Sequence, residues 1–98
     1  RPGQIALSSV GSAVEALVRG VAMEIAPRRI NVVSPGMIDT PMHGPDGPER
    51  SKASDARCAN NLIPRAGTAD EVAEAVLWLL SERASYVTRS ILDVAGGR

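Results

Sequence analysis

The 98-residue sequence contains very few aromatic residues, with no Phe, one Trp and one Tyr. Its apolar side chains are mostly Ala, Val, Leu and Ile, so we expect a core that is thin in large side chains. Cys58 is the only cysteine, which excludes an internal disulfide and fits a reducing cytoplasm. His43 is the only histidine and Cys58 gives no second thiol, so the sequence contains no cluster of His and Cys ligands and we expect no metal site.

The sequence has no excess of positive or negative charge, since eleven Lys and Arg residues balance eleven Asp and Glu residues. Without a net positive field or a basic run, nucleic acid is not an expected partner. No apolar run approaches the roughly 18 residues that a membrane helix needs, and residues 1–3 lack the features of a signal peptide. We therefore expect a cytoplasmic chain without membrane contact. Because the first residue is Arg1 rather than Met, we also expect the chain to begin inside a longer one.

A long helical pattern runs from Ala6 to Ala26. Apolar residues recur there at steps of three and four, which predicts one amphipathic helix over the whole range. Pro27 is expected to end this helix. Arg28 and Arg29 then stand near its carboxyl end, where positive charge suits the helix dipole.

Two further kinds of local signal stand later in the chain. Thr68 and Glu71 form a capping box, which predicts a helix that begins there and ends within 81–84. The short apolar runs Ile30–Val33 and Ile91–Val94 predict buried strands. The order helix, strand, loop, helix, strand favours a parallel α/β arrangement. Two strands alone leave their edges unpaired, so we expect part of a larger sheet.

The segment from Pro35 to Pro41 is the candidate binding loop. Gly36 has no Cβ to block close approach, and the two prolines restrict the backbone around it. Residues 38–40 then present backbone amides and one hydroxyl. A loop at the carboxyl end of a strand is the usual position of a ligand in an open parallel sheet. An ordinary strand-to-helix connection that binds nothing explains the same residues.

The stretch 43–65 is rich in Gly, Pro, Asp, Ser, Arg and Asn and has no long apolar run. We expect an excursion with short helical turns around 49–61, which is either a lid over a site or a solvated surface loop. His43 is expected to be an exposed loop residue rather than a catalyst. Tyr86, the one tyrosine of the sequence, and Trp78, which no second aromatic accompanies, are expected to be packing residues rather than an acid-base group and a stacking platform.

In their order and spacing, these segments resemble the carboxyl-terminal part of the short-chain dehydrogenase/reductase family, across essentially the whole chain. The matching pieces are EALVR (15–19), AMEIAP (22–27), INVVSPG (30–36) with DTP (39–41), RAGTADEVA (65–73), SYVT (85–88) and LDVAGG (92–97). The resemblance implies an α/β fold, namely the carboxyl-terminal part of a Rossmann-like doubly wound parallel sheet, with two helices and two strands in this chain. Residues 1–98 would be one segment of a single dehydrogenase domain whose amino-terminal cofactor-binding part is absent from this chain.

The resemblance also implies a cofactor site, because members of the family bind NAD or NADP and transfer hydride between the nicotinamide and an alcohol or carbonyl substrate. Pro35 and Gly36 match the family's Pro-Gly turn beside the nicotinamide. Ile38 matches the position whose backbone meets the carboxamide, and Thr40 matches a hydroxyl that contacts the carboxamide or the diphosphate. Such backbone contacts can orient the ring for hydride transfer. The stretch 42–65 matches the family's variable substrate lid.

Two departures from the family pattern concern the chemistry. The glycine-rich phosphate motif is absent, so the chain alone is not expected to hold a dinucleotide. Aligned on 15–27, the family's catalytic Tyr-x-x-x-Lys pair falls at Leu7 and Gly11, and residues 1–29 contain neither Tyr nor Lys. Leucine and glycine can neither transfer a proton nor supply the cation that supports the tyrosine. We therefore assign no catalytic residue, and catalysis either uses groups outside this segment or has been lost.

Three hypotheses stay open at this point. The first is a segment of an NAD(P)-dependent oxidoreductase, inactive on its own, and the second is a non-catalytic nucleotide-binding or assembly protein on the same fold. The third is an independent small helical interaction module, in which the Pro-Gly loop has no use. For a complete protein we expect a homo-oligomer formed through the Ala6–Ala26 helix, where Ser8, Ser12 and Gly20 allow close approach of a second helix. Burial of this helix against its own sheet is the rival explanation.

Overall fold

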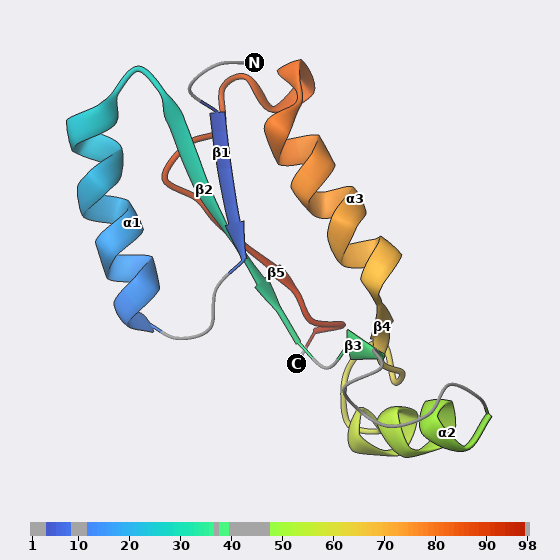
Figure 1. Ribbon diagram of the computed structural model, residues 1–98. Helices are drawn as coiled ribbons and strands as arrows, with labels where there is room; N and C mark the ends of the chain where they lie inside the picture. Colours follow the sequence, from blue (N-terminus) through green and yellow to red (C-terminus); the bar gives the residue numbers. More distant parts are fainter. Residues whose placement is uncertain (1–3, 9–11, 37, 40–47, 98) are drawn as a thin grey trace.

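The computed structural model describes residues 4–8, 12–36, 38–39 and 48–97 (Figure 1). In chain order the elements are β1 (Gln4–Ser8), α1 (Ser12–Ile25), β2 (Arg29–Pro35), β3 (Ile38–Asp39), α2 (Pro48–Arg57), β4 (Gly67–Thr68), α3 (Ala69–Leu80), the 3-10 helix η2 (Glu82–Ala84) and β5 (Ile91–Val94). The main sheet has the order β1-β2-β5, β3 pairs with β4, and all of these pairings are parallel. A parallel sheet of this kind excludes the hypothesis of an independent helical module.

The central strand of the main sheet is β2. In register, Val32 pairs with Leu7 of β1 on one edge and with Ile91 of β5 on the other. Asn31, Val32 and Val33 follow one another and are all fully buried, so both faces of β2 are covered. Helices on both faces are the usual environment of a parallel strand.

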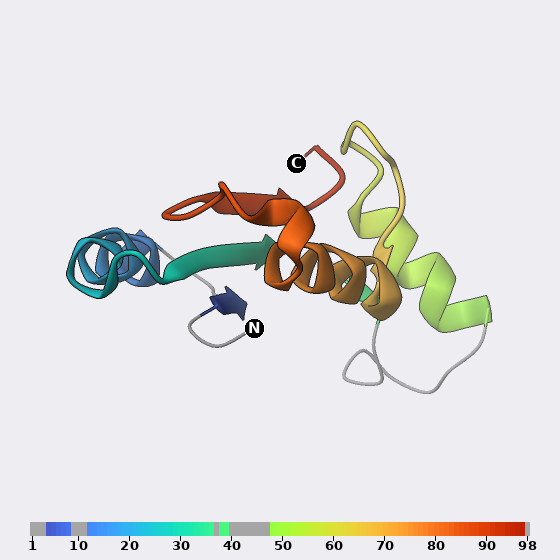
Figure 2. The same cartoon turned by 90° about the horizontal axis from the view of Figure 1, so that it is seen from above.

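The helices that connect the main strands lie on opposite faces of the sheet, with α1 on one face and α3 on the other (Figures 1 and 2). Both connections step in the same direction across the sheet, from β1 to β2 and from β2 to β5. Two crossover connections that step in the same direction across a sheet, with their helices on opposite faces, have opposite handedness. One of them is therefore of the left-handed kind, which is rare among parallel connections.

Small and medium side chains form the core, as the composition predicts. Val18 and Ala22 of α1 are 2% and 7% exposed and pack with Ile30 and Val32 of β2. On the other face, Leu79 of α3 is 2% exposed. No aromatic side chain is among the buried core residues in the described part of the chain.

The prediction of a packing role for Tyr86 is wrong. Its side chain is fully exposed in this chain, and Trp78 is 43% exposed. Tyr86 lies in a turn that follows η2, and this turn contacts the sheet through its backbone rather than through the phenol. Trp78 is not among the buried core residues.

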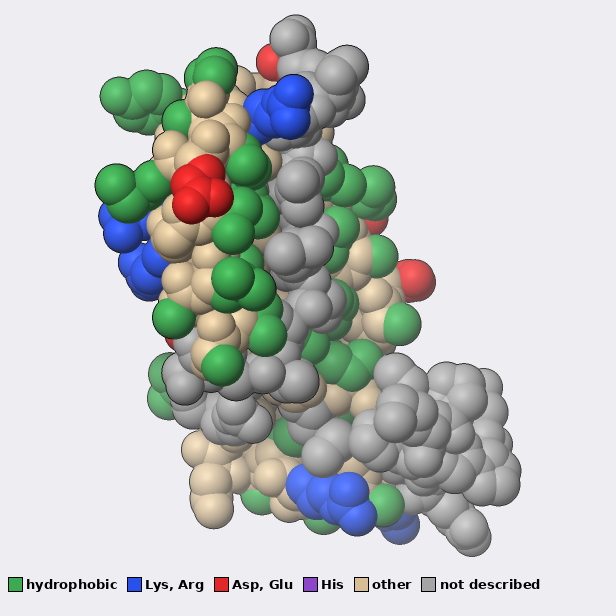
Figure 3. Space-filling model, turned by 60° about the vertical axis from the view of Figure 1, so that its left-hand side comes forward, with side chains coloured by type: hydrophobic (Ala, Val, Ile, Leu, Met, Phe, Trp, Pro, Cys, Tyr) green, Lys and Arg blue, Asp and Glu red, His purple; other side chains and the backbone are tan. Residues whose placement is uncertain are grey.

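The outer face of α1 is also apolar. Leu17 and Met23 point away from the sheet and are 65% and 73% exposed. Gly20, on the same face, has no atom within 4 Å of the position that a Cβ would take. Hydrophobic side chains gather on the side of the molecule that carries α1 (Figure 3).

The prediction of one helix from Ala6 to Ala26 is wrong at its amino end. Residues 4–8 form β1, and α1 begins at Ser12. The helical period is present from Val14 onward, where Val14 and Val18 face the sheet. Residues 6–8 fit the same period. They form a strand because each edge of β2 presents backbone N–H and C=O groups that need hydrogen-bond partners, and β1 supplies these partners on one edge. The two helices and two strands that were predicted are also too few, since the described residues add α2, β1, β3 and β4.

The helix predicted from the capping box is confirmed. The backbone N–H of Glu71 donates to Oγ1 of Thr68 at 3.1 Å, and the backbone N–H of Thr68 donates to Oε1 of Glu71 at 2.9 Å. α3 ends at Leu80, with Ser81 as its C-cap. The two predicted strands are confirmed as parts of β2 and β5.

Arg29 does not serve the carboxyl end of the first helix, contrary to the prediction. It is the first residue of β2 and is 7% exposed. Its guanidinium donates to the carbonyl oxygen of Leu79 at 2.8 Å and of Val87 at 2.9 Å, with a longer contact of 3.4 Å to Ser81. The last carbonyls of a helix have no partner within the helix. A buried cation on the sheet therefore holds the carboxyl end of α3.

Candidate functional site

The predicted binding loop lies at the carboxyl end of the central strand. Pro35 is the last residue of β2 and pairs in register with Val94, the last residue of β5. The backbone N–H of Gly36 donates to the carbonyl of Val94 at 3.0 Å, so the chain leaves the sheet directly beside the end of β5. In open α/β sheets, this edge is where ligands usually bind.

Gly36 has a packing reason to be glycine. A Cβ at this position would lie 2.8 Å from the Cβ of Ala95 and 2.9 Å from its Cα. Carbon atoms do not approach so closely, and the backbone of Ala95 cannot swing aside as the end of a long side chain can. The close approach of the two chain segments thus requires glycine independently of any ligand.

Of the other two predicted cofactor residues, the structure describes Ile38 but not Thr40. Ile38 begins β3 and lies opposite Gly67 of β4 in a parallel pairing. Thr40 lies outside the described residues, as does His43. Pro35, Gly36 and Ile38 therefore lie along one edge of the molecule, where β2 ends and β3 pairs with β4.

The pairing of β3 with β4 brings the two ends of the predicted excursion together. The expected helical turns are present as α2. The backbone N–H of Ala66 donates to Oδ1 of Asp55 at 3.0 Å, which ties the returning chain to this helix. Ser54 and Cys58 are 3% and 2% exposed, and the Cys58 thiol is free. The described part of the excursion is thus a folded unit with a buried side.

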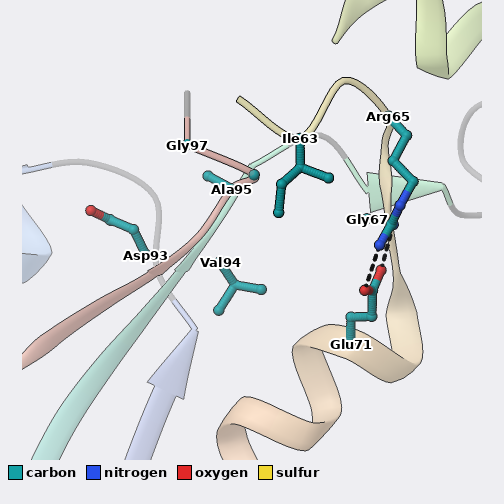
Figure 4. Close-up of a pocket in the computed structure, with 9 residues that line it drawn as sticks. Ile63, Arg65, Gly67, Glu71, Asp93, Val94, Ala95 and Gly97 are labelled. Carbon is teal, nitrogen blue, oxygen red and sulfur yellow. Dashed lines mark hydrogen bonds and ion pairs between the residues drawn. The ribbon is translucent and has the colours of Figure 1, made fainter. Parts of the chain in front are cut away.

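A pocket of about 340 Å³ opens where these segments meet (Figure 4). Its walls are the stretch 93–97 at the end of β5, Ile63, Arg65, Gly67 and Glu71. In Figure 4 the side chain of Asp93 is directed away from the pair formed by Arg65 and Glu71. The predicted loop borders the pocket without lining it, because Gly36 approaches Ala95 and Ile38 pairs with Gly67.

Arg65 and Glu71, in the pocket wall, form an ion pair with two hydrogen bonds. The two terminal nitrogens of Arg65 donate to the two carboxylate oxygens of Glu71 at 2.8 Å and 2.9 Å. These hydrogen bonds, together with the one from the Thr68 backbone, lower the pKa of Glu71 to about 2, and the same contact raises the pKa of Arg65. An anionic ligand would have to displace Glu71 from Arg65. The remaining walls are the apolar side chains of Ile63 and Val94, the backbone at Gly67 and 95–97, and Asp93, whose side chain is directed away from the Arg65–Glu71 pair. The apolar and backbone part of these walls suits an uncharged group.

The positions matched to the family's catalytic pair do not share a helix. Leu7 lies in β1, and Gly11 lies outside the described residues. Side chains four residues apart are close neighbours in a helix, where they stand one turn apart, but they lie about 13 Å apart along a strand. At Leu7 the chain therefore differs from the pattern in backbone conformation as well as in residue type.

The described part of the chain offers neither a metal centre nor a membrane span. No group of three or more His, Cys, Asp or Glu residues is placed there to hold a metal ion. None of the helices in that part is long and apolar enough to cross a membrane.

The sequence places Ile63 and Arg65 only within the lid stretch 42–65, without a role for either residue, and it gives Ala95 no role at the site. Arg65 stands six residues before Glu71 and outside the helix, so the spacing rule for ion pairs on helices does not find it. Ile63 meets the end of β5 only in the folded chain, where its backbone N–H donates to the Gly96 carbonyl at 2.8 Å. The sequence signal that could have indicated this contact is the pair of glycines, Gly96 and Gly97, that follows the last strand.

Known proteins are similar to this chain in sequence and in fold. The family model described as enoyl-(acyl carrier protein) reductase matches residues 2–98. The chain is 43% identical over 88 residues to the uncharacterized oxidoreductase YgfF of Escherichia coli (strain K12), covering 88% of this chain and 35% of the relative. It is 38% identical over 96 residues to the cyclic-di-GMP-binding biofilm dispersal mediator protein of the same organism, covering 96% of this chain and 39% of the relative.

Comparison with solved structures also places this chain among dehydrogenases. A small-chain dehydrogenase in complex with NADPH matches with a TM-score of 0.78 and 28% identity, over 99% of this chain and 52% of that protein. The chain thus spans 35% to 39% of the length of the two curated relatives. Its fold is the carboxyl-terminal part of a Rossmann-like doubly wound parallel sheet, as the family resemblance implies. The chain belongs to the short-chain dehydrogenase/reductase family.

Proposed function

We propose that residues 1–98 are the carboxyl-terminal segment of a single-domain NAD(P)-dependent oxidoreductase. The observation that carries this proposal is the loop at Pro35 and Gly36, fixed beside the end of β5 and next to a pocket. The matched relatives are between two and three times as long as this chain, which supports placing the amino-terminal cofactor-binding part upstream of it.

In this proposal the loop contacts the nicotinamide side of NAD or NADP. Pro35 and Gly36 bring the backbone close to the ring, and the backbone of Ile38 orients the carboxamide so that one face is presented for hydride transfer. The hydroxyl of Thr40 adds a hydrogen bond to the carboxamide or the diphosphate. A structural relative that is a complex with NADPH supports a nicotinamide cofactor.

The pocket beside the loop is the proposed place of the alcohol or carbonyl substrate. Its apolar and backbone walls suit an uncharged carbon skeleton, since the charge of Arg65 is already paired with Glu71 and the side chain of Asp93 is directed away from that pair. The stretch that contains α2 and returns through Ile63 forms one side of the proposed substrate lid. Substrate choice would then depend on this stretch.

The proposed subunit contact of a homo-oligomer is α1. Leu17 and Met23 are exposed on its outer face, and Gly20 leaves room for a second helix to approach. Burial of the opposite face by Val18 and Ala22 accounts for the rest of its apolar residues. The contact is limited to Ser12–Ile25, because residues 4–8 belong to the sheet.

The test is hydride transfer by the protein that contains this chain together with its upstream sequence. Reduction of aldehydes, ketones and 3-oxoacyl thioesters is followed with NADH and with NADPH, and oxidation of alcohols with the oxidised cofactors. Substrate-dependent turnover with either cofactor supports the proposal. Saturable dinucleotide binding without turnover of any substrate would contradict the enzymatic role, and no dinucleotide binding would contradict the cofactor site as well.

A non-catalytic nucleotide-binding or assembly protein on the same fold is the second candidate. The observation that favours it is Leu7 in a strand, at the position matched to the catalytic tyrosine. One relative is named for binding cyclic-di-GMP and mediating biofilm dispersal, which supports a binding role for this fold. This candidate predicts binding of a dinucleotide or a cyclic dinucleotide with no turnover in the same assay.

A further inference from the structure

The turn after β5 directs its carbonyl groups at the returning end of the excursion. Gly96 and Gly97 have φ of +66° and +78°, in the left-handed region that glycine adopts without strain. In this conformation the Gly96 carbonyl accepts from the backbone N–H of Ile63 at 2.8 Å. The Ala95 carbonyl accepts from Nδ2 of Asn61 at 3.4 Å. Two successive carbonyls therefore hold one short segment.

The two segments touch with no space for a side chain between them. A Cβ on Gly96 would lie 3.1 Å from the carbonyl oxygen of Ile63. A Cβ on Gly97 would lie 2.7 Å from the Cβ of Leu62. The contact depends on glycine at both positions, for these steric reasons and because of the positive φ.

The same turn also holds the proposed cofactor loop. The carbonyl of Val94 accepts from Gly36, and Ala95 lies against Gly36. The stretch 94–97 thus joins the cofactor loop on one side to the segment 61–63 on the other. Ile63, Val94 and Ala95 all line the pocket, and Figure 4 shows Ile63 and Val94 on neighbouring walls.

We propose that the turn 95–97, together with Asn61, positions the Ile63 wall of the pocket and thereby sets the affinity for the substrate. Asn61 is not among the residues that line the pocket, so it is a positioning residue that acts through Ile63. The cofactor loop has its own hydrogen bond to Val94, and a change at Asn61 leaves that bond in place. The identity of the ligand rests on the proposed function, whereas the contact itself does not.

The test compares Asn61→Asp with Asn60→Asp in the protein that includes the upstream sequence. Both variants replace an amide with a carboxylate, and Asn60 is an exposed neighbour. Only at Asn61 does the new carboxylate face a carbonyl oxygen, where repulsion replaces a hydrogen bond. The measurements are the hydrogen-exchange rate of the Ile63 amide, the Kd for NADPH, and kcat and KM for the carbonyl compound of the panel that is reduced fastest.

For Asn61→Asp we expect the Ile63 amide to exchange at least about tenfold faster and KM to rise about three- to tenfold, while kcat and the Kd for NADPH change less than about twofold. Asn60→Asp is expected to leave all four quantities unchanged. Identical behaviour of the two variants would overturn the proposal, and so would a loss of NADPH affinity as large as the rise in KM. Without turnover of any substrate the proposed function fails, and the exchange rate of Ile63 still decides whether the turn holds this segment. Asn61→Ala removes the donor without adding charge, and is measured in the same way if the aspartate variant does not fold.

Discussion

The two connections between neighbouring strands of the main sheet are built in different ways. The first, from β1 through α1 to β2, is held by the apolar burial of one face of α1. The second, from β2 through α2 and α3 to β5, has directional polar contacts at both ends of α3. Thr68, Glu71 and Arg65 hold its start, and Arg29 holds its end. Geometrically specific contacts are thus concentrated in the connection that carries the pocket, while the first connection leaves an apolar surface open on α1.

Arg29→Met is expected to have the largest effect on the second connection. Methionine keeps an apolar stem of similar length but removes the side-chain donor of the Leu79 carbonyl, and it leaves the Val87 carbonyl with Nδ2 of Asn31 alone. We expect the free energy of unfolding to fall by about 2–4 kcal/mol in urea denaturation of the protein with its upstream sequence. The exposed neighbour Arg28 supplies the control, since Arg28→Met should change it by less than about 0.5 kcal/mol. Equal losses in the two variants would show that the buried cation does not hold α3.

Gly36→Ala tests the junction between the second connection and the cofactor loop. Because its Cβ would lie 2.8 Å from the Cβ of Ala95, we expect a loss of about 1–3 kcal/mol in stability together with weaker dinucleotide binding. The double variant with Ala95→Gly removes one of the clashing atoms and should recover part of the stability, while dinucleotide affinity stays low. Recovery of stability and affinity in parallel would remove Gly36 from the cofactor site.

Glu71→Gln tests the start of α3 through its pH dependence. The pKa of Glu71 falls from an ordinary value of 4.5 to about 2 in the folded chain. A carboxylate with a lowered pKa stabilises the fold above its unfolded pKa, and this stabilisation is lost as the pH falls from 4.5 toward 2. Glutamine keeps the capping oxygen without the charge, so the unfolding free energy of the variant should decline less over this range. The pair is exposed and the difference is small, and superimposable pH profiles of the two proteins would contradict it.

Leu17→Arg tests the first connection and should have the smallest effect on stability. Leu17 is 65% exposed, so we expect a change within about 0.5 kcal/mol in the free energy of unfolding. If α1 is the subunit contact, a charge on its outer face separates the subunits, and the mass measured by light scattering falls. Glu74→Arg, on the exposed side of α3, is the control and should keep the mass of the parent protein. An unchanged mass for Leu17→Arg would remove α1 from the subunit contact.

The parts of the fold that could be predicted from the sequence have partners close along the chain. The Thr68 and Glu71 box is complete within four residues, and α3 begins where it indicates. β1 is too short for its period to separate strand from helix, and only its pairing with β2 decides. The backbone partner of Arg29 at Leu79 is 50 residues away, so no local rule distinguishes this arginine from one that ends the preceding helix.

The candidate site could be predicted in outline only. The Pro-Gly signal located the loop at Pro35 and Gly36 correctly at the end of a strand. The pocket could not be predicted, because its walls come from the return of the excursion, the start of α3 and the end of β5. These segments meet through backbone hydrogen bonds such as that between Ile63 and Gly96. The two glycines mark one side of this contact in the sequence, but nothing in the sequence marks the segment that they meet.

In the proposed function, residues 1–98 supply one side of a dinucleotide site that upstream sequence completes. Fluorescence titration with NADPH and NADH tests this most directly, on residues 1–98 alone and on the protein with its upstream sequence. We expect saturable binding of at least one of the two by the longer protein and none by residues 1–98. Saturable binding by residues 1–98 alone, or no binding by the longer protein, would contradict the account.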